Sequence, residues 1–125
     1  MLRYSGGTTK INGVAIFLYK KMLYSLTSVS SISDRIMHIR LSHRHGHMTV
    51  VCAYAPTEQN TQSKDSFYNT LDSVLRNVPP HDELIILGDF NATTGSNRDM
   101  YEDVIGLFGS RSGSLNDQCK KNLSV

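Results

Sequence analysis

The sequence contains few cysteines, no long hydrophobic run and little excess charge of either sign. Its two cysteines, Cys52 and Cys119, are too few for a disulfide framework. The longest uninterrupted apolar run, residues 14–19, is far too short to cross a bilayer, so we expect no membrane partner. Lys and Arg number 13 against 11 Asp and Glu, and the resulting charge of +2 neither indicates nor excludes a nucleic-acid partner.

The remaining composition is that of a globular domain. The 125 residues are 39% hydrophobic and 19% charged, which suits one domain with a buried core. No internal repeat or low-complexity linker is visible. The serine-rich patch Ser25–Ser33 lies between alternating apolar segments, and we interpret it as strand ends and a loop.

Apolar and alternating segments predict strands in the first half of the chain. Gly13–Tyr19 is typical of a buried strand, and Met22–Thr27 is a shorter candidate. Asp34–Leu41 alternates in polarity, and Met48–Ala55 is rich in apolar and β-branched residues. Because the polar turn Ser42–Gly46 separates the last two segments, we expect them to form an antiparallel hairpin.

The apolar period changes to a helical one after residue 63. One helical face is formed by Phe67, Leu71, Val74, Leu75 and Val78. Ser63 is the predicted N-cap, and Pro79 and Pro80 end the helix. A fully apolar, buried strand is expected at Leu84–Leu87, and a short helix at Tyr101–Leu107. The order of strands, helix and strand predicts a mixed α/β fold.

Two polar side chains follow the apolar strand Leu84–Leu87. Asp89 and Asn91 are separated by one residue in the segment Gly-Asp-Phe-Asn-Ala, at a strand end where α/β proteins commonly place sites. A carboxylate there can hold water or a metal ion, and an amide can donate to a phosphate oxygen. Spacing alone favours the alternative, an Asx turn that uses both residues for turn chemistry.

Tyr54 occupies a similar place near the end of Met48–Ala55, just before Pro56. Its hydroxyl can hydrogen-bond a bound phosphate, and the alternative is an ordinary half-buried tyrosine. Cys52, inside the same strand, is interpreted as an inert core thiol.

Three histidines, His43, His45 and His47, alternate in the predicted turn and could bind zinc. No carboxylate or cysteine partner lies nearby in the sequence, so a solvated loop is favoured. Asp34 and Arg35 are adjacent at a strand end and predict an ion pair there.

These segments together resemble the endonuclease/exonuclease/phosphatase superfamily, most of all the endonuclease domains of non-LTR retrotransposons and similar craniofacial-development-protein-like sequences. The segment Gly-Asp-Phe-Asn-Ala after an apolar strand is specific to the family. The other stretches are weak individually, but together they occur in the same order as in the family. The matching stretches are Tyr4–Gly7, Gly13–Ile16, Ser33–Ile36, Ala53–Thr57, Lys64–Tyr68, Leu87–Ala92 and Asn116–Asp117.

The resemblance implies a partial four-layered α/β sandwich that lacks its first and last strands, as a single partial domain over residues 1–125. It also implies a fragment of a phosphodiesterase that uses Mg²⁺ or Mn²⁺ and acts on DNA, with a reverse transcriptase domain as a candidate companion in a longer parent polypeptide. The alternative is a non-catalytic, degenerate copy that acts as an interaction module.

Site roles follow from the resemblance position by position. Asp89 corresponds to the aspartate that activates or orients the attacking water, and it is also the one candidate metal ligand. Asn91 corresponds to the asparagine that binds the scissile phosphate, and Tyr54 to the tyrosine that supports it. Asn116 corresponds to a further polar residue near the substrate.

The sequence departs from the family pattern at several positions. The segments that carry the metal-binding glutamate and the catalytic histidine are not matched, and Cys119 replaces a usual glycine. Because metal, base and phosphate clamp act as one unit, we expect no more than trace nuclease activity from the isolated chain.

Overall fold

The computed structural model describes residues 1–6, 12–57 and 61–92 of the chain. In chain order the elements are β1 (Leu2–Gly6), β2 (Gly13–Phe17), a 3₁₀ helix η1 (Lys20–Ser25), β3 (Leu26–Ser31), β4 (Ile36–His43), β5 (Gly46–Tyr54), α1 (Thr61–Arg76) and β6 (Glu83–Asp89).

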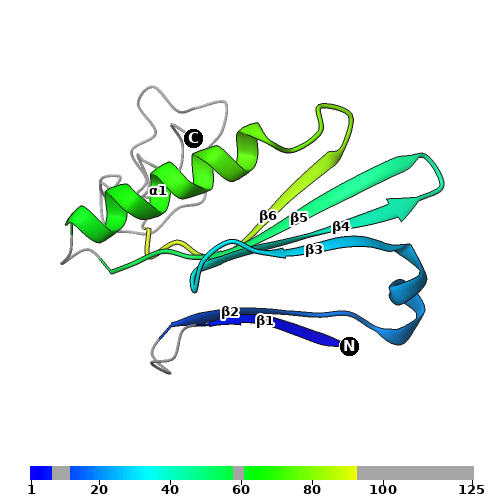
Figure 1. Ribbon diagram of the computed structural model, residues 1–125, viewed down its shortest axis with the longest axis horizontal. Coiled ribbons are helices and arrows are strands. Elements are labelled where there is room, and N and C mark those ends of the chain that lie inside the picture. The colour runs from blue at the N-terminus through cyan, green and yellow to red at the C-terminus, as the bar shows by residue number, and fades with distance from the viewer. Residues whose placement is uncertain (7–11, 58–60, 93–125) are drawn as a thin grey trace, which may run out of the picture.

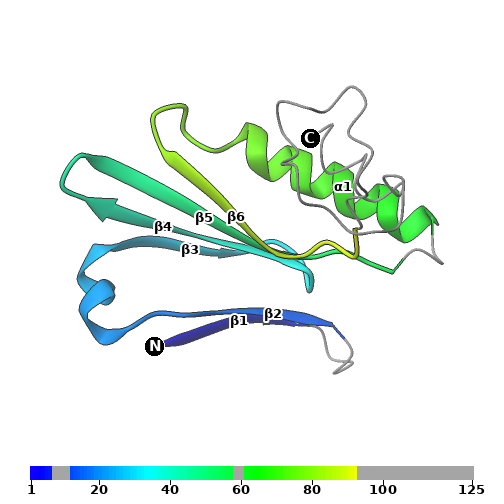
Figure 2. The same ribbon diagram turned by 180° about the vertical axis from the view of Figure 1, so that it is seen from behind.

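The described strands form two sheets in a mixed α/β arrangement. The hairpin β1–β2 lies below a four-stranded sheet of order β3-β4-β5-β6, and α1 lies on the opposite face of that larger sheet (Figures 1 and 2). The mixed α/β class predicted from the sequence is therefore confirmed.

The predicted hairpin at the centre of the larger sheet is also confirmed. β4 and β5 pair antiparallel from Ile36 opposite Ala53 to His43 opposite Gly46. The turn is tighter than expected, because both strands extend into the polar segment and only Arg44 and His45 remain between them. The β-ladder therefore continues through residues whose polarity suggested a loop.

Alternation along β4 and β5 divides the buried side chains between two cores. On one face, Ile36 and Val51 pack against Phe67 and Leu71 of α1. On the other face, Ile39, Leu41 and Val50 pack with Leu18, just after β2. Each face of the larger sheet is apolar and must be covered. For this reason the sheet lies as a middle layer between α1 and the β1–β2 hairpin (Figure 1).

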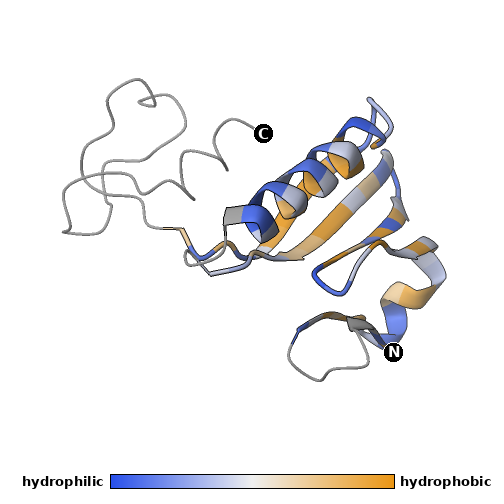
Figure 3. Cartoon of the chain, turned by 60° about the vertical axis from the view of Figure 1, so that its left-hand side comes forward, coloured by the Kyte–Doolittle hydropathy of each residue, from blue (hydrophilic) through white to orange (hydrophobic). Residues whose placement is uncertain are grey.

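The helix α1 matches its predicted apolar face. Phe67, Leu71 and Val74 are buried, whereas Asp65 and Asn69 are exposed. Figure 3 shows the hydrophobic side of α1 turned towards the sheet and its hydrophilic side turned away. The helix begins at Thr61, two residues before the predicted cap, and ends at Arg76, so the predicted Val78 lies beyond it.

The segment after β2 differs from the prediction. Met22 and its neighbours up to Ser25 form η1 instead of a strand, and a six-residue strand, β3, follows within the serine-rich patch. Serine does not favour strands intrinsically, so β3 forms because β4 offers a backbone edge with which Val29, Ser30 and Ser31 pair.

The strand β6 was predicted at the right place but with the wrong burial. Leu84, Ile85, Ile86 and Leu87 are 43%, 38%, 39% and 53% exposed. Among the described residues, β6 pairs only with β5 and is the outer strand of the larger sheet. An apolar run identifies a strand without showing whether that strand lies at the centre or the edge.

The helix predicted at Tyr101–Leu107 lies outside the described residues. In the described part of the chain, no helix combines the length and apolar character that a membrane crossing requires.

An ion pair at the start of β6 joins three segments. Asp82 accepts hydrogen bonds from Nε of Arg40 at 2.7 Å and from the hydroxyl of Thr49 at 2.8 Å. The Asp82 side chain is only 2% exposed. The hydrogen bond from Arg40 is the main cause that lowers the pKa of Asp82 from 3.8 to about 2. This contact connects β4 and β5 to the chain that enters β6.

We expect Asp82→Asn to lower stability at neutral pH and to remove part of its acid dependence. The folded-state pKa of Asp82 lies below its ordinary value of 3.8. The contribution of Asp82 to the free energy of unfolding is therefore complete above this ordinary value, and it declines as pH falls towards about 2. Urea midpoints of the two proteins should therefore differ most above about pH 5 and converge in acid.

Asp72→Asn is the matched control, because Asp72 pairs with Arg76 on the exposed surface of α1, with side chains that are 40% and 77% exposed. Its effect should be smaller. A constant difference between wild type and Asp82→Asn over the whole pH range would contradict the prediction.

Candidate functional site

The structure brings Tyr54 and Asp89 side by side. They are the last residues of β5 and β6, and they are direct partners in the parallel ladder. Parallel pairing carries both strands in one direction, so their carboxyl ends meet at the same edge of the sheet. Tyr54 is half-buried and Asp89 is exposed.

Asn91 reaches the same place by a sharp change in backbone direction. Its φ of 46° lies in the left-handed region, which asparagine tolerates better than most residues. Its side-chain amide donates to the carbonyl oxygen of Ala55 at 2.7 Å. The contact holds Asn91 against the end of β5, and a second N–H remains on the same amide nitrogen.

The turn after β6 has the Asx geometry considered from the sequence. One carboxylate oxygen of Asp89 accepts a hydrogen bond from the backbone N–H of Asn91 at 2.9 Å. The backbone N–H of Ala55 donates to the carbonyl oxygen of Asp89 at 2.8 Å. Turn chemistry thus uses one oxygen of the Asp89 side chain, and the second oxygen of this exposed group is left for water or a ligand.

Gly88 allows β6 to approach β5 closely just before the site. Its φ is 152°, and a Cβ at this position would lie 1.8 Å from the carbonyl oxygen of Ala53. No side chain larger than hydrogen fits there without moving one strand. The glycine of the Gly-Asp-Phe-Asn-Ala segment therefore has a steric role in placing Asp89 beside Tyr54.

Arg35 contacts Tyr54, whereas its place in the sequence predicted an ion pair with Asp34. The ion pairs among the described residues do not include Asp34 with Arg35. Instead, Arg35 donates to the carbonyl oxygen of Tyr54 at 3.2 Å, and its guanidinium carbon lies 5.0 Å from the centre of the Tyr54 ring. Adjacent residues do not reveal this contact, because it joins positions 19 apart in the chain.

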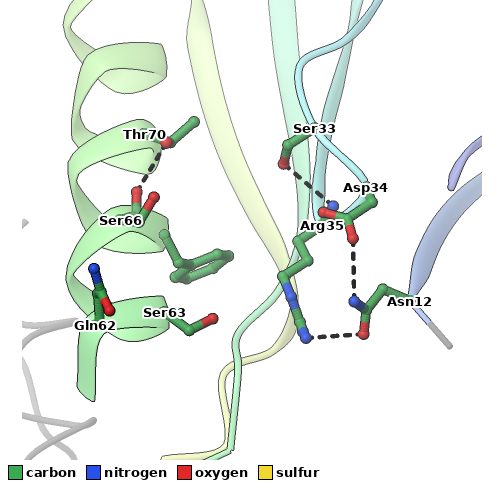
Figure 4. Close-up of a pocket in the computed structure, with 9 residues that line it drawn as sticks. Asn12, Ser33, Asp34, Arg35, Gln62, Ser63, Ser66 and Thr70 are labelled. Carbon is green, nitrogen blue, oxygen red and sulfur yellow. Dashed lines mark hydrogen bonds between the residues drawn. The ribbon is translucent and has the colours of Figure 1, made fainter. Parts of the chain in front are cut away.

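A polar cavity of about 530 Å³ opens next to Arg35. One wall is formed by Asn12 and residues 33–35, and the other by one side of α1 between Gln62 and Thr70 (Figure 4). Tyr54, Asp89 and Asn91 do not line it. Arg35 therefore lines the cavity and also contacts Tyr54, one of the three predicted site residues.

Metal-binding side chains do not cluster in the described part of the chain, where no group of three or more His, Cys, Asp or Glu could hold an ion. His43 and His45 contact each other edge to face, with ring centres 6.5 Å apart, and His43 lies 3.9 Å from Glu83. Only His45 lies in the turn, because His43 ends β4 and the half-buried His47 belongs to β5, so the loop expected from the sequence is shorter than the histidine segment.

At the strand ends, the described residues offer one exposed carboxylate, that of Asp89, to a hard cation. Mg²⁺ commonly keeps several waters and takes one or two carboxylates together with substrate phosphates. Asp89 is a carboxylate of this kind, exposed and with one oxygen outside the Asx turn.

Asn116 lies outside the described residues. Cys52 is half-buried, and burial raises the pKa of its thiol, which lowers the thiolate fraction on which its reactivity depends.

The chain is similar in sequence to craniofacial development protein 2, one of the groups that its motifs predicted. It is 31% identical over 99 residues to craniofacial development protein 2 of Bos taurus, in a match that covers 78% of this chain and 16% of that protein. The same protein of Tragulus javanicus is 30% identical over 99 residues, with 78% and 17% covered. This chain therefore aligns with only about one sixth of these curated relatives.

The endonuclease domain of TRAS1, a telomere-specific non-LTR retrotransposon, aligns with a TM-score of 0.48 and 20% identity, over 74% of this chain and 42% of that domain. No family model matches the chain.

Gly88→Ala should destabilise the protein by about 3 kcal/mol, because it combines an unfavourable backbone conformation with a clash against Ala53. Gly46→Ala is the matched control. Gly46 has a φ of 150°, and a Cβ there meets nothing within 4 Å. Its cost should be about 1 kcal/mol, from the backbone alone. Equal shifts of the two urea midpoints would show that close strand approach is not what Gly88 provides.

Proposed function

We propose that this chain is part of a metal-dependent phosphodiesterase, most specifically a retrotransposon-type DNA endonuclease, whose substrate phosphate binds at the ends of β5 and β6. The observation that carries the proposal is the register of the parallel ladder, which sets Tyr54 beside Asp89. A hydrogen bond from the Asn91 amide to Ala55 then holds Asn91 at the same end of β5. The family motifs assign phosphate chemistry to these three residues, and the fold gathers them at one edge.

Each residue has a distinct task in this proposal. The remaining N–H of the Asn91 amide donates to a non-bridging phosphate oxygen, and the Tyr54 hydroxyl supports the same phosphate. Asp89 orients the attacking water with the oxygen that the Asx turn leaves over. Hydrogen-bond donors that are already fixed in place stabilise the charge that develops on the phosphoryl oxygens, because these donors need not reorganise during the reaction.

The proposed cofactor is Mg²⁺ or Mn²⁺, with Asp89 as the described residue that would hold it. When bound, the ion polarises the phosphoryl oxygen. The proposed substrate is DNA, and a reverse transcriptase domain is a proposed companion in a longer parent polypeptide.

Binding of DNA tests the proposal without requiring turnover. We expect Tyr54→Phe and Asn91→Gly each to weaken the affinity for a labelled DNA duplex about tenfold, because each removes a hydrogen bond to a charged group. Glycine is chosen for position 91 because it accepts the left-handed backbone. Fluorescence anisotropy measures affinity, and thermal unfolding confirms that each variant is folded.

Matched controls lie away from the strand ends. Asn77 is exposed, and its amide also donates to a backbone carbonyl, that of Ser73 at 2.7 Å. Asn77→Gly and substitution to Phe at Tyr24, which is 92% exposed, should leave DNA affinity unchanged. The proposal fails if the site variants bind DNA as tightly as the wild type does.

Cleavage by the 125-residue chain on its own should be no more than trace. The metal, the base and the phosphate clamp act as a unit, and the glutamate and histidine of the family pattern have no match in this sequence. Nicking of supercoiled plasmid in Mg²⁺ measures this activity. Robust nicking that disappears in Asp89→Ala would contradict the prediction.

A further inference from the structure

Arg35 holds Tyr54 through both its backbone and its ring. The backbone N–H of Tyr54 donates to the carbonyl oxygen of Arg35 at 2.9 Å, and the Arg35 guanidinium donates back to the carbonyl oxygen of Tyr54 at 3.2 Å. The guanidinium carbon is also 5.0 Å from the ring centre, within the range of a cation–π contact. One residue thus restrains the main chain and the side chain of Tyr54 together.

The guanidinium is itself held in place from the other side. It donates to the side-chain oxygen of Asn12 at 2.8 Å, and the amide nitrogen of Asn12 donates to Asp34 at 3.1 Å. The backbone N–H of Arg35 donates to the hydroxyl of Ser33 at 3.2 Å. Figure 4 shows this chain of contacts along one wall of the cavity. A planar fork fixed at two points has little freedom left, so it can fix what it touches.

Arg35 also carries a positive charge that none of the ion pairs of the described residues neutralises. Two of its five guanidinium N–H groups donate to the carbonyl oxygen of Tyr54 and to Asn12. By contrast, Arg40 in the same sheet is bound to the nearly buried Asp82 with two hydrogen bonds. The two arginines therefore have different environments, and only Arg40 has an obvious ion-pair role.

We propose that Arg35 is a positioning residue that orients Tyr54 for the substrate phosphodiester. The inference rests on the proposed function, because it takes Tyr54 as a phosphate-supporting residue. A purely structural arginine would restrain the loop between β3 and β4 without any need to lie against the tyrosine ring. In this structure, the cation–π contact and two hydrogen bonds with the backbone of Tyr54 are all made by Arg35.

A double-substitution cycle tests the inference. Arg35→Gln should weaken DNA affinity about fivefold in the wild-type chain and much less in a Tyr54→Phe background, because coupled residues do not act additively. Arg35→Lys keeps the charge but loses the fork, so it should restore only part of the affinity. Arg44→Gln, in the exposed turn between β4 and β5, is the control and should have no effect.

Nuclear magnetic resonance of the tyrosine rings supplies a readout that does not depend on DNA. The Tyr54 ring signals, identified by their absence in Tyr54→Phe, should shift in Arg35→Gln and in Arg35→Lys, and remain in place in Arg44→Gln. A role confined to stability would change the melting temperature and leave these signals unshifted in variants that are still folded.

The outcomes separate the two proposals. If Tyr54→Phe leaves DNA affinity unchanged, the proposed function fails, whatever Arg35 does. If Tyr54→Phe weakens binding but Arg35→Gln gives the same loss in both backgrounds, or leaves the Tyr54 ring signals unshifted, the positioning role of Arg35 is overturned. Non-additive losses together with shifted ring signals support it.

Discussion

The close parallel pairing of β5 with β6 is the contact on which the proposed site depends. Its register sets Tyr54 opposite Asp89, and Gly88 is the residue that permits the approach because any Cβ there would overlap the carbonyl oxygen of Ala53. A shift of one residue along this ladder would turn Asp89 to the opposite face of the sheet. The strand pair therefore fixes the relative positions of Tyr54 and Asp89, and the turn after β6 adds Asn91.

The two ends of the larger sheet are stabilised in different ways. At the start of β6, the side chain of Asp82 is almost fully buried, and it pairs with Arg40 and accepts a hydrogen bond from Thr49. At the far end, Asp89 is exposed, and its described partner is a backbone N–H. A satisfied, enclosed carboxylate suits a structural contact, whereas an exposed carboxylate with an oxygen to spare suits exchange with water and ligands.

The features that could be predicted from the sequence are those that depend on local pattern. The β4–β5 hairpin and the apolar face of α1 follow from periods of two and 3.6 residues, and the turn after β6 follows from Asp89 and Asn91. The strand β3 could not be predicted with the same ease, since a serine-rich segment becomes a strand only through the edge that β4 offers.

Contacts between distant segments were also beyond local pattern. Arg35 contacts Tyr54 and Asn12, which lie 19 and 23 positions away in the sequence. The residues next to Arg35 in the sequence indicate neither partner. The exposure of β6 belongs to the same category, because burial depends on how many layers cover a strand. Tyr54, Asp89 and Asn91 could be selected by motif, but their mutual arrangement required the sheet.

The outer position of β6 has a consequence for how copies of this chain meet. Four apolar residues, each more than a third exposed, on a strand that is outermost among the described strands would by themselves favour edge-to-edge association. Antiparallel pairing of two copies centred on Ile86 would bring Glu83 of one copy opposite Asp89 of the other. Like charges placed directly opposite each other disfavour a ladder, so the acidic ends of the strand work against pairing in this register.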